Sequence, residues 1–266
     1  MVTSRVFATA AAVVLAAGSL FAQTTQVLPD RAQQPAVPGG LSTPPPVPSP
    51  ELTPERRGDI LMARKMYREA VESYKQGPLD SPVIWNKIGI AYHQMMQLDQ
   101  ARRHYERAIK LNGKYSEAIN NLGTIYYAKK SYRRATGYYR RALKLAPQSA
   151  SIYSNLGTAF FARKKYKDAF DAYQQALSLD PEVFEHRSTY GVLLQERSVE
   201  ERAKFHYYLA RTYAKAGMND RALLYLRKAL EEGFRERQKL AEDPEFTPLK
   251  ELPEFQELLK LEPRVL

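Results

Sequence analysis

The stretch SEAINNLGTIYYAKKSYRRATGYYRRALKLAPQS (residues 116–149) has a near copy on either side, at a fixed spacing of 34 residues. The copies begin at Pro82 and Ala150, and their apolar positions agree column by column. The columns contain Trp85, Ile119, Tyr153; Ile88, Leu122, Leu156; Gly89, Gly123, Gly157; Tyr92, Tyr126, Phe160; Ala101, Ala135, Ala169; Tyr105, Tyr139, Tyr173; and Ala108, Ala142, Ala176. A period of this length indicates an array of repeated supersecondary units.

The spacing within each unit predicts two helices that pack through these columns. In the first helix, the large residue, the Leu or Ile three positions later, the Gly and the next aromatic fall on one face. We expect the Gly and the Ala of the second helix to lie where the two axes cross closely. One unit cannot bury its own apolar stripe, so neighbours must stack. The column aromatics are therefore interpreted as core, not as a cofactor or base-stacking site.

The pattern resembles the tetratricopeptide repeat, in which each unit is a helix, a turn and a second helix. The resemblance implies an all-α, right-handed superhelical solenoid of helix-turn-helix repeats over residues 51–236. The units run from about 51–81, 82–115, 116–149, 150–183 and 203–236, the first being shorter by three residues. Thr53 and Pro54 suit the cap and first position of its first helix.

Two further segments complete the predicted array. Residues 184–202 are a 19-residue insertion, for which an irregular segment is favoured over an extra helix. Within it, Ser198 and Glu201 have the spacing of a capping box and predict the start of the next helix. Residues 237–266 should form a helical cap that covers the last unit, with an apolar face of Phe246, Leu249, Phe255, Leu258 and Leu259.

The amino-terminal residues differ in composition from the repeats. Residues 1–22 have a basic start at Arg5 and an Ala- and Val-rich apolar run, the pattern of a secretory signal peptide. Residues 23–50 are a Pro-rich segment that we expect to be a disordered linker. We therefore predict export to a periplasm or the exterior, with a bacterial envelope favoured. A membrane partner is expected only if the signal segment stays uncleaved as an anchor.

The resemblance also suggests a peptide groove. In tetratricopeptide repeats, notably those of glycosyltransferases that act on protein hydroxyls, an Asn ladder lines the concave groove and hydrogen-bonds a bound peptide backbone. Asn121 and Asn155 occupy that position here, 34 residues apart, whereas Lys87 and Tyr208 replace Asn in the flanking units. The full set of groove candidates is Asn86, Asn120, Asn121, Thr124, Tyr127, Ser154, Asn155 and Thr158.

Basic residues recur around the turn between the two helices of successive units. The chain has a formal net charge of +11, which favours acidic partners. Export weighs against nucleic acid. Stacking would align the basic residues as a ridge, although a solvated surface that keeps the array soluble is favoured over a dedicated binding ridge. The ridge candidates are Lys129, Lys130, Arg133, Arg134, Arg163, Lys164 and Lys165.

Motifs for catalysis are absent from the sequence. It has no cysteine, no glycine-rich phosphate loop, no zinc-binding His-Glu pair at helical spacing and no serine nucleophile elbow. We therefore expect no catalytic residue, no metal and no cofactor. The sequence favours a non-catalytic scaffold of the cell envelope that binds another protein or peptide in its groove. The alternatives are a basic module for anionic envelope polymers, and an enzyme subunit whose catalytic part lies on another chain.

Overall fold

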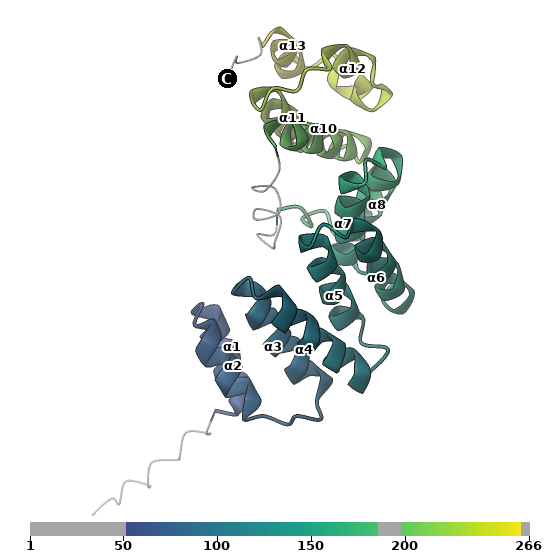
Figure 1. The fold of residues 1–266 in the computed structure, drawn as a ribbon. Helices are drawn as coiled ribbons and strands as arrows, with labels where there is room; N and C mark the ends of the chain where they lie inside the picture. The colour runs from purple at the N-terminus through teal and green to yellow at the C-terminus, as the bar shows by residue number, and fades with distance from the viewer. Residues whose placement is uncertain (1–51, 186–197, 262–266) are drawn as a thin grey trace, which may run out of the picture. The chain divides into compact units, whose positions relative to one another are not determined.

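A computed structural model describes residues 52–185 and 198–261 of the chain (Figure 1). The described residues form helices and no strand, which confirms the all-helical repeat fold. The predicted signal peptide, the Pro-rich linker and most of the predicted insertion lie outside these residues. Among the described helices, none is long and apolar enough to span a membrane.

Five helical hairpins follow one another within the described residues. The helices are α1 (Pro54–Ala63) with α2 (Tyr67–Lys75), α3 (Pro82–Gln94) with α4 (Leu98–Leu111), α5 (Ser116–Ala128) with α6 (Tyr132–Leu145), α7 (Ala150–Ala162) with α8 (Tyr166–Leu179), and α10 (Val199–Lys215) with α11 (Asn219–Glu231). The second helix of each hairpin contacts the first helix of the next one. This stacking buries the apolar stripe that a single hairpin would leave exposed.

The turn inside each hairpin has the same backbone geometry. The second residue after the first helix has a positive φ in every hairpin: Lys65, Met96, Lys130, Lys164 and Gly217. At Lys130, its N–H donates to the Tyr127 carbonyl, and the Ser131 N–H donates to the Tyr126 carbonyl. These two bonds define a Schellman motif, which satisfies carbonyls that the end of a helix leaves free. The same pair of bonds closes the other four turns.

A glycine of the first helix meets a tyrosine of the second helix in four of the five hairpins. The pairs are Gly58 with Tyr74, Gly89 with Tyr105, Gly123 with Tyr139, and Gly157 with Tyr173. A Cβ at any of these glycines would lie 2.3 to 2.7 Å from a ring carbon of its tyrosine. The fifth hairpin has Ala210 and Leu226 in the same two columns, both fully buried. In that hairpin, Leu226 replaces the tyrosine ring and leaves room for the Ala210 methyl group.

The boundary between the fourth and fifth hairpins is packed by residues just after α8. Val183 and Phe184 are buried, and the Phe184 ring meets Tyr173 and Tyr213 edge-on. The fifth hairpin begins with Ser198, whose hydroxyl accepts a hydrogen bond from the Glu201 N–H at 3.2 Å. The last residues assigned to the insertion, 199–202, therefore belong to helix α10.

The array ends in three short helices: α12 (Arg237–Glu242), the 3-10 helix η1 (Pro244–Leu249) and α13 (Pro253–Lys260). Of the five residues predicted for the apolar face of the cap, Phe246, Leu249, Phe255 and Leu258 are buried. Leu259 is half-buried. Helix η1 contacts α10, and α13 contacts α11. These helices thus cover the last hairpin, which confirms the predicted helical cap.

Candidate protein-binding face

The first helices of the hairpins form one continuous side of the array. Helix α3 contacts α5, and α5 contacts α7, whereas the second helices make no comparable contacts with one another in the described part. The array therefore curves locally toward its first helices. We call the surface formed by α3, α5 and α7 the inner face.

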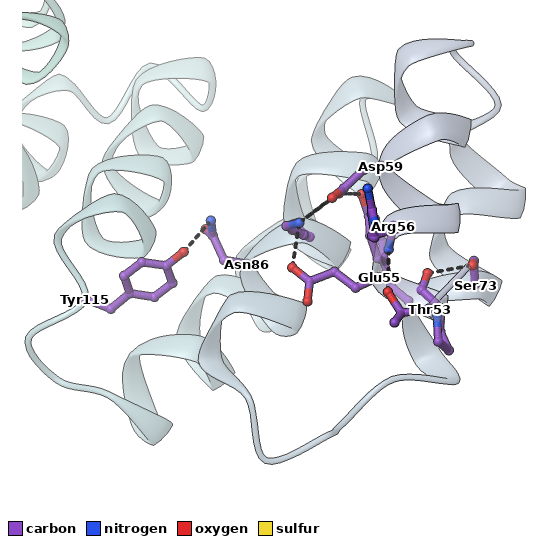
Figure 2. A network of polar contacts seen from close by, with 10 residues as sticks. Thr53, Glu55, Arg56, Asp59, Ser73, Asn86 and Tyr115 are labelled. Carbon is purple, nitrogen blue, oxygen red and sulfur yellow. Dashed lines mark hydrogen bonds and ion pairs between the residues drawn. The ribbon is translucent and has the colours of Figure 1, made fainter. Parts of the chain in front are cut away.

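Four asparagine side chains on the inner face are joined head to tail by hydrogen bonds. Asn155 Nδ2 donates to Asn120 Oδ1 at 3.0 Å, and Asn120 Nδ2 donates to Asn121 Oδ1 at 3.4 Å. Asn121 Nδ2 then donates to Asn86 Oδ1 at 3.0 Å. Asn86 Nδ2 closes the series on the Tyr115 hydroxyl at 3.4 Å, as Figure 2 shows. These five residues, which we call the amide chain, connect α7, α5 and α3.

The amide chain leaves hydrogen-bonding groups free at both ends and along its length. Each Nδ2 has two hydrogens, and one is used in the chain. Within the described residues, Asn155 Oδ1 accepts no hydrogen bond, and the Tyr115 hydroxyl accepts one without donating its own proton. Asn120, Asn121 and Asn155 are half-buried, whereas Asn86 is buried. The three half-buried amides can therefore reach a ligand while their neighbours hold them in place.

A charged cluster borders the amide chain on the side of α1. Lys87 Nζ lies 2.7 Å from carboxylate oxygens of both Glu55 and Asp59, which Figure 2 labels. The Tyr74 hydroxyl donates to Asp59 at 2.8 Å. Burial opposes the charge on Lys87, but its hydrogen bonds to the two carboxylates outweigh that effect and raise its pKa. Lys87 therefore replaces the expected Asn with an ion pair to the preceding hairpin. The sequence showed the substitution but not its partners.

Besides Asn86, four of the predicted groove residues are buried in this structure. Thr124 and Thr158 accept hydrogen bonds from the hydroxyls of Tyr139 and Tyr173, at 3.4 and 3.3 Å. Ser154 is 1 % exposed, and Tyr127, at 6 % exposure, has its ring against Tyr132. These side chains turn toward the interior of the array, so they do not line the groove. Of the eight candidates, the amides of Asn120, Asn121 and Asn155 remain partly accessible.

The predicted basic ridge is partly neutralised. Lys129 pairs with Asp99 at 2.5 Å, and Lys165 pairs with Asp168 at 3.6 Å. Arg163 donates to the Thr136 hydroxyl at 3.1 Å. Lys130 and Lys164 are exposed at the positive-φ turn position, and Arg133 and Arg134 are exposed on α6. The sequence predicted the location of these cations but could not show which of them have acidic partners.

Aromatic residues outside the predicted site lie where the α7–α8 turn meets α10. Tyr166 and Tyr208 stack with ring centroids 5.0 Å apart, and Lys204 Nζ lies 4.5 Å from the Tyr166 centroid. A cavity of about 290 Å³ opens there, lined partly by Phe161, Tyr166 and Lys204. Because Tyr208 stands in the column of Asn121 and Asn155, the amide series ends at this aromatic site.

A larger cavity, of about 640 Å³, lies between α1, α2 and α3. Its lining includes Leu61 and Arg57, which occupy the columns of Tyr92 and Ile88 in the second hairpin. In that hairpin these columns pack against the hairpin before it. The cavity is therefore explained by the position of α1 at the start of the described array. Within the described residues, no group of three or more His, Asp or Glu could hold a metal ion.

The sequence model of the tetratricopeptide repeat family matches residues 80–148 and 115–182. A crystal structure of MamA resembles the chain with a TM-score of 0.46 and 20% identity, covering 70% of this chain and 96% of MamA. MamA from Desulfovibrio magneticus RS-1 gives 0.47 and 20%, covering 67% and 92%.

YrrB, described as a tetratricopeptide repeat protein with an unusual peptide-binding site, gives 0.45 and 17%, covering 71% and 89%. No curated protein sequence matches the chain. The 34-residue period, the five hairpins and the family match agree. Residues 80–182 therefore match the tetratricopeptide repeat family, and the hairpins before and after them continue the same helical repeat fold.

Proposed function

We propose that this protein is a non-catalytic scaffold of the cell envelope that binds an extended segment of a partner protein along its inner face. The observation that carries the proposal is the amide chain. A carboxamide both donates and accepts hydrogen bonds, as does a peptide group, so a row of amides is suited to an extended backbone. An extended segment also leaves its own N–H and C=O groups free for such contacts.

The mutual hydrogen bonds of the amides support this assignment. An isolated Asn on a helix surface samples several rotamers, and binding a ligand would then require ordering it. Here Asn120 is bonded on both sides, and Asn155 is bonded through its nitrogen. Their remaining hydrogen-bonding groups therefore have fixed directions before a partner arrives, which lowers the entropy lost on binding.

The charges of the inner face indicate a partner segment of low net charge. On the three helices of the inner face, the Lys, Arg, Asp and Glu residues are Lys87, which pairs with Glu55 and Asp59 of α1, and Glu117 of α5. The excess positive charge of the described residues lies on other elements, among them α6 and α10. An acidic partner, which the total charge favours, is therefore not expected at this face. Binding here should also depend little on salt.

A peptide selection tests the proposal. Peptides selected from a random library on the full chain would be titrated against the wild type, Asn120→Ala and Asn155→Ala. Gln175→Ala is the matched control, because it removes an exposed amide from the outer side of α8. We expect each Asn substitution to weaken binding about tenfold, and the control to have no effect, at both ~50 and ~500 mM salt. Equal affinities of all four proteins would contradict the proposal.

The proposed envelope location rests on the signal-peptide pattern of residues 1–22. Amino-terminal sequencing of the mature protein tests it independently of the binding site. A start near residue 23 is expected, and a start at Met1 would show that the segment is not cleaved.

A further inference from the structure

Helix α6 has the most uniform charge of the described helices. Its fourteen residues include Arg133, Arg134, Arg140, Arg141 and Lys144, and no Asp or Glu. None of these five side chains has an acidic partner within 4.0 Å in the described part of the chain. The Glu106 carboxylate, which acts on Tyr138 of α6, is already paired with Arg102. All five basic side chains are exposed. Together these five side chains form a positively charged patch that no acidic residue of the described part of the chain neutralises.

Three of the arginines are held in place by contacts that do not neutralise them. The Arg134 guanidinium lies 5.7 Å from the Tyr126 ring centroid, and that of Arg140 lies 5.3 Å from the Phe160 centroid. Arg141 donates to the Gly113 carbonyl at 3.1 Å. A guanidinium has five N–H donors, so each arginine keeps donors for a planar anion such as a carboxylate.

Gly137 lies at the centre of this group. The four arginines are three or four positions away on either side, which places them around Gly137 on one helix face. Nothing lies within 4 Å of where its Cβ would be. A glycine inside a helix costs about 1 kcal/mol relative to alanine. Packing within the chain therefore gives no reason for a glycine here.

The other glycines inside the described helices show what such a position accommodates. Gly58, Gly89, Gly123 and Gly157 each receive a tyrosine ring from a neighbouring helix. Gly137 offers the same gap on an exposed surface, with no ring in it.

We propose that α6 is a second docking surface, which binds an acidic segment of a partner protein. The segment packs closely against Gly137, and its carboxylates pair with Arg133, Arg134, Arg140 and Arg141. The positive charge of the arginines favours an acidic segment, and the absence of a Cβ at Gly137 allows the backbone or a ring of that segment to approach the helix. A lipid surface fits less well, because the one exposed large apolar residue of α6 is Leu145, at its end. A flexible polyanion would need the arginines but not the glycine.

The test uses the full chain and a fluorescein-labelled 14-residue peptide of Glu and Ala with one central Tyr. Gly137→Gln fills the gap with a neutral side chain of good helix propensity, so it should raise the thermal midpoint while weakening binding about tenfold. Arg140→Gln should weaken binding by a similar factor. Arg103→Gln is the matched control, since it removes an exposed charge from α4, and it should change affinity less than about twofold.

Three outcomes would overturn the proposal. One is Gly137→Gln binding the peptide as tightly as the wild type. Another is Arg103→Gln weakening binding as much as Arg140→Gln, which would indicate general charge attraction. The last is no binding of the peptide at ~50 mM salt, where exposed charges are screened least, whether or not anionic phospholipid vesicles or a sulfated polysaccharide bind.

Discussion

The contact between Gly123 and Tyr139 makes the substitution Gly123→Ala a direct test of how the hairpins pack. The new Cβ would lie 2.7 and 2.9 Å from two Tyr139 ring carbons and 3.2 Å from the Tyr138 Cβ. Carbon atoms in ordinary contact are about 3.5 to 4.0 Å apart. Tyr139 is 2 % exposed and its hydroxyl bonds to Thr124, so the ring cannot move away without disturbing the core.

Two opposing effects determine the size of the change. Alanine gains about 1 kcal/mol over glycine in helix propensity. Overpacking of a tight core costs about 1 to 3 kcal/mol, and the short distances favour the upper end. We therefore expect Gly123→Ala to lose about 2 kcal/mol of stability. Gly137→Ala makes the same chemical change in open space and should gain about 1 kcal/mol.

Urea unfolding followed by far-ultraviolet circular dichroism measures both variants. The double variant Gly123→Ala/Tyr139→Leu copies the Ala210 and Leu226 pair of the fifth hairpin. When Tyr139 is already replaced by Leu, the substitution Gly123→Ala should lower the free energy of unfolding by at least ~1 kcal/mol less than it does in the wild type. Equal unfolding midpoints for Gly123→Ala and Gly137→Ala would refute the packing argument, since they would show that the ring exerts no constraint.

Three further predictions concern single residues. Met96→Gly should gain about 0.5 to 1 kcal/mol in urea unfolding, because Met96 has φ +59° and is exposed, whereas Met96→Val should lose stability. Burial disfavours the charged form of His93 and lowers the pKa of this side chain in the folded protein. Above the ordinary histidine pKa of about 6.5, the imidazole is neutral in both the folded and the unfolded protein, and the fold keeps its full stability. That stability is lost as the pH falls below this value, and His93→Gln should unfold with a smaller dependence on acid pH. Asn121→Leu should lose about 1 to 3 kcal/mol by leaving the buried Asn86 oxygen without its donor, whereas Gln175→Leu should change stability by less than ~0.5 kcal/mol.

The sequence predicted the hairpin fold well because a strict period repeats the same packing several times. The columns of small residues, such as Gly123 and Ala135, indicated a close crossing of two helices, and in the structure the Tyr139 ring lies against Gly123. The shorter first unit, the start of a helix after Ser198 and the apolar cap also followed from local signals. Each of these depends on residues that are close in sequence or related by the repeat.

The binding site was predicted less well, because it depends on the direction in which each side chain points, and the repeat spacing alone does not determine that direction. A position nine residues into a unit points toward the second helix rather than the groove, which is why Thr124 and Thr158 bond to tyrosine hydroxyls. The bond from Asn155 to Asn120 joins neighbouring columns of successive units, and an inspection of single columns does not reveal it. Likewise, the ion pairs of Lys87 with Glu55 and Asp59 depend on side-chain reach.

The most direct test of the central claim is a nuclear magnetic resonance titration of the asparagine side-chain amides with a selected peptide. If the peptide binds along the inner face, the NH₂ signals of Asn120, Asn121 and Asn155 should shift and saturate together, while that of Gln175 should not move. Shifts confined to residues of α6, with the three asparagine amides unchanged, would contradict binding at the inner face.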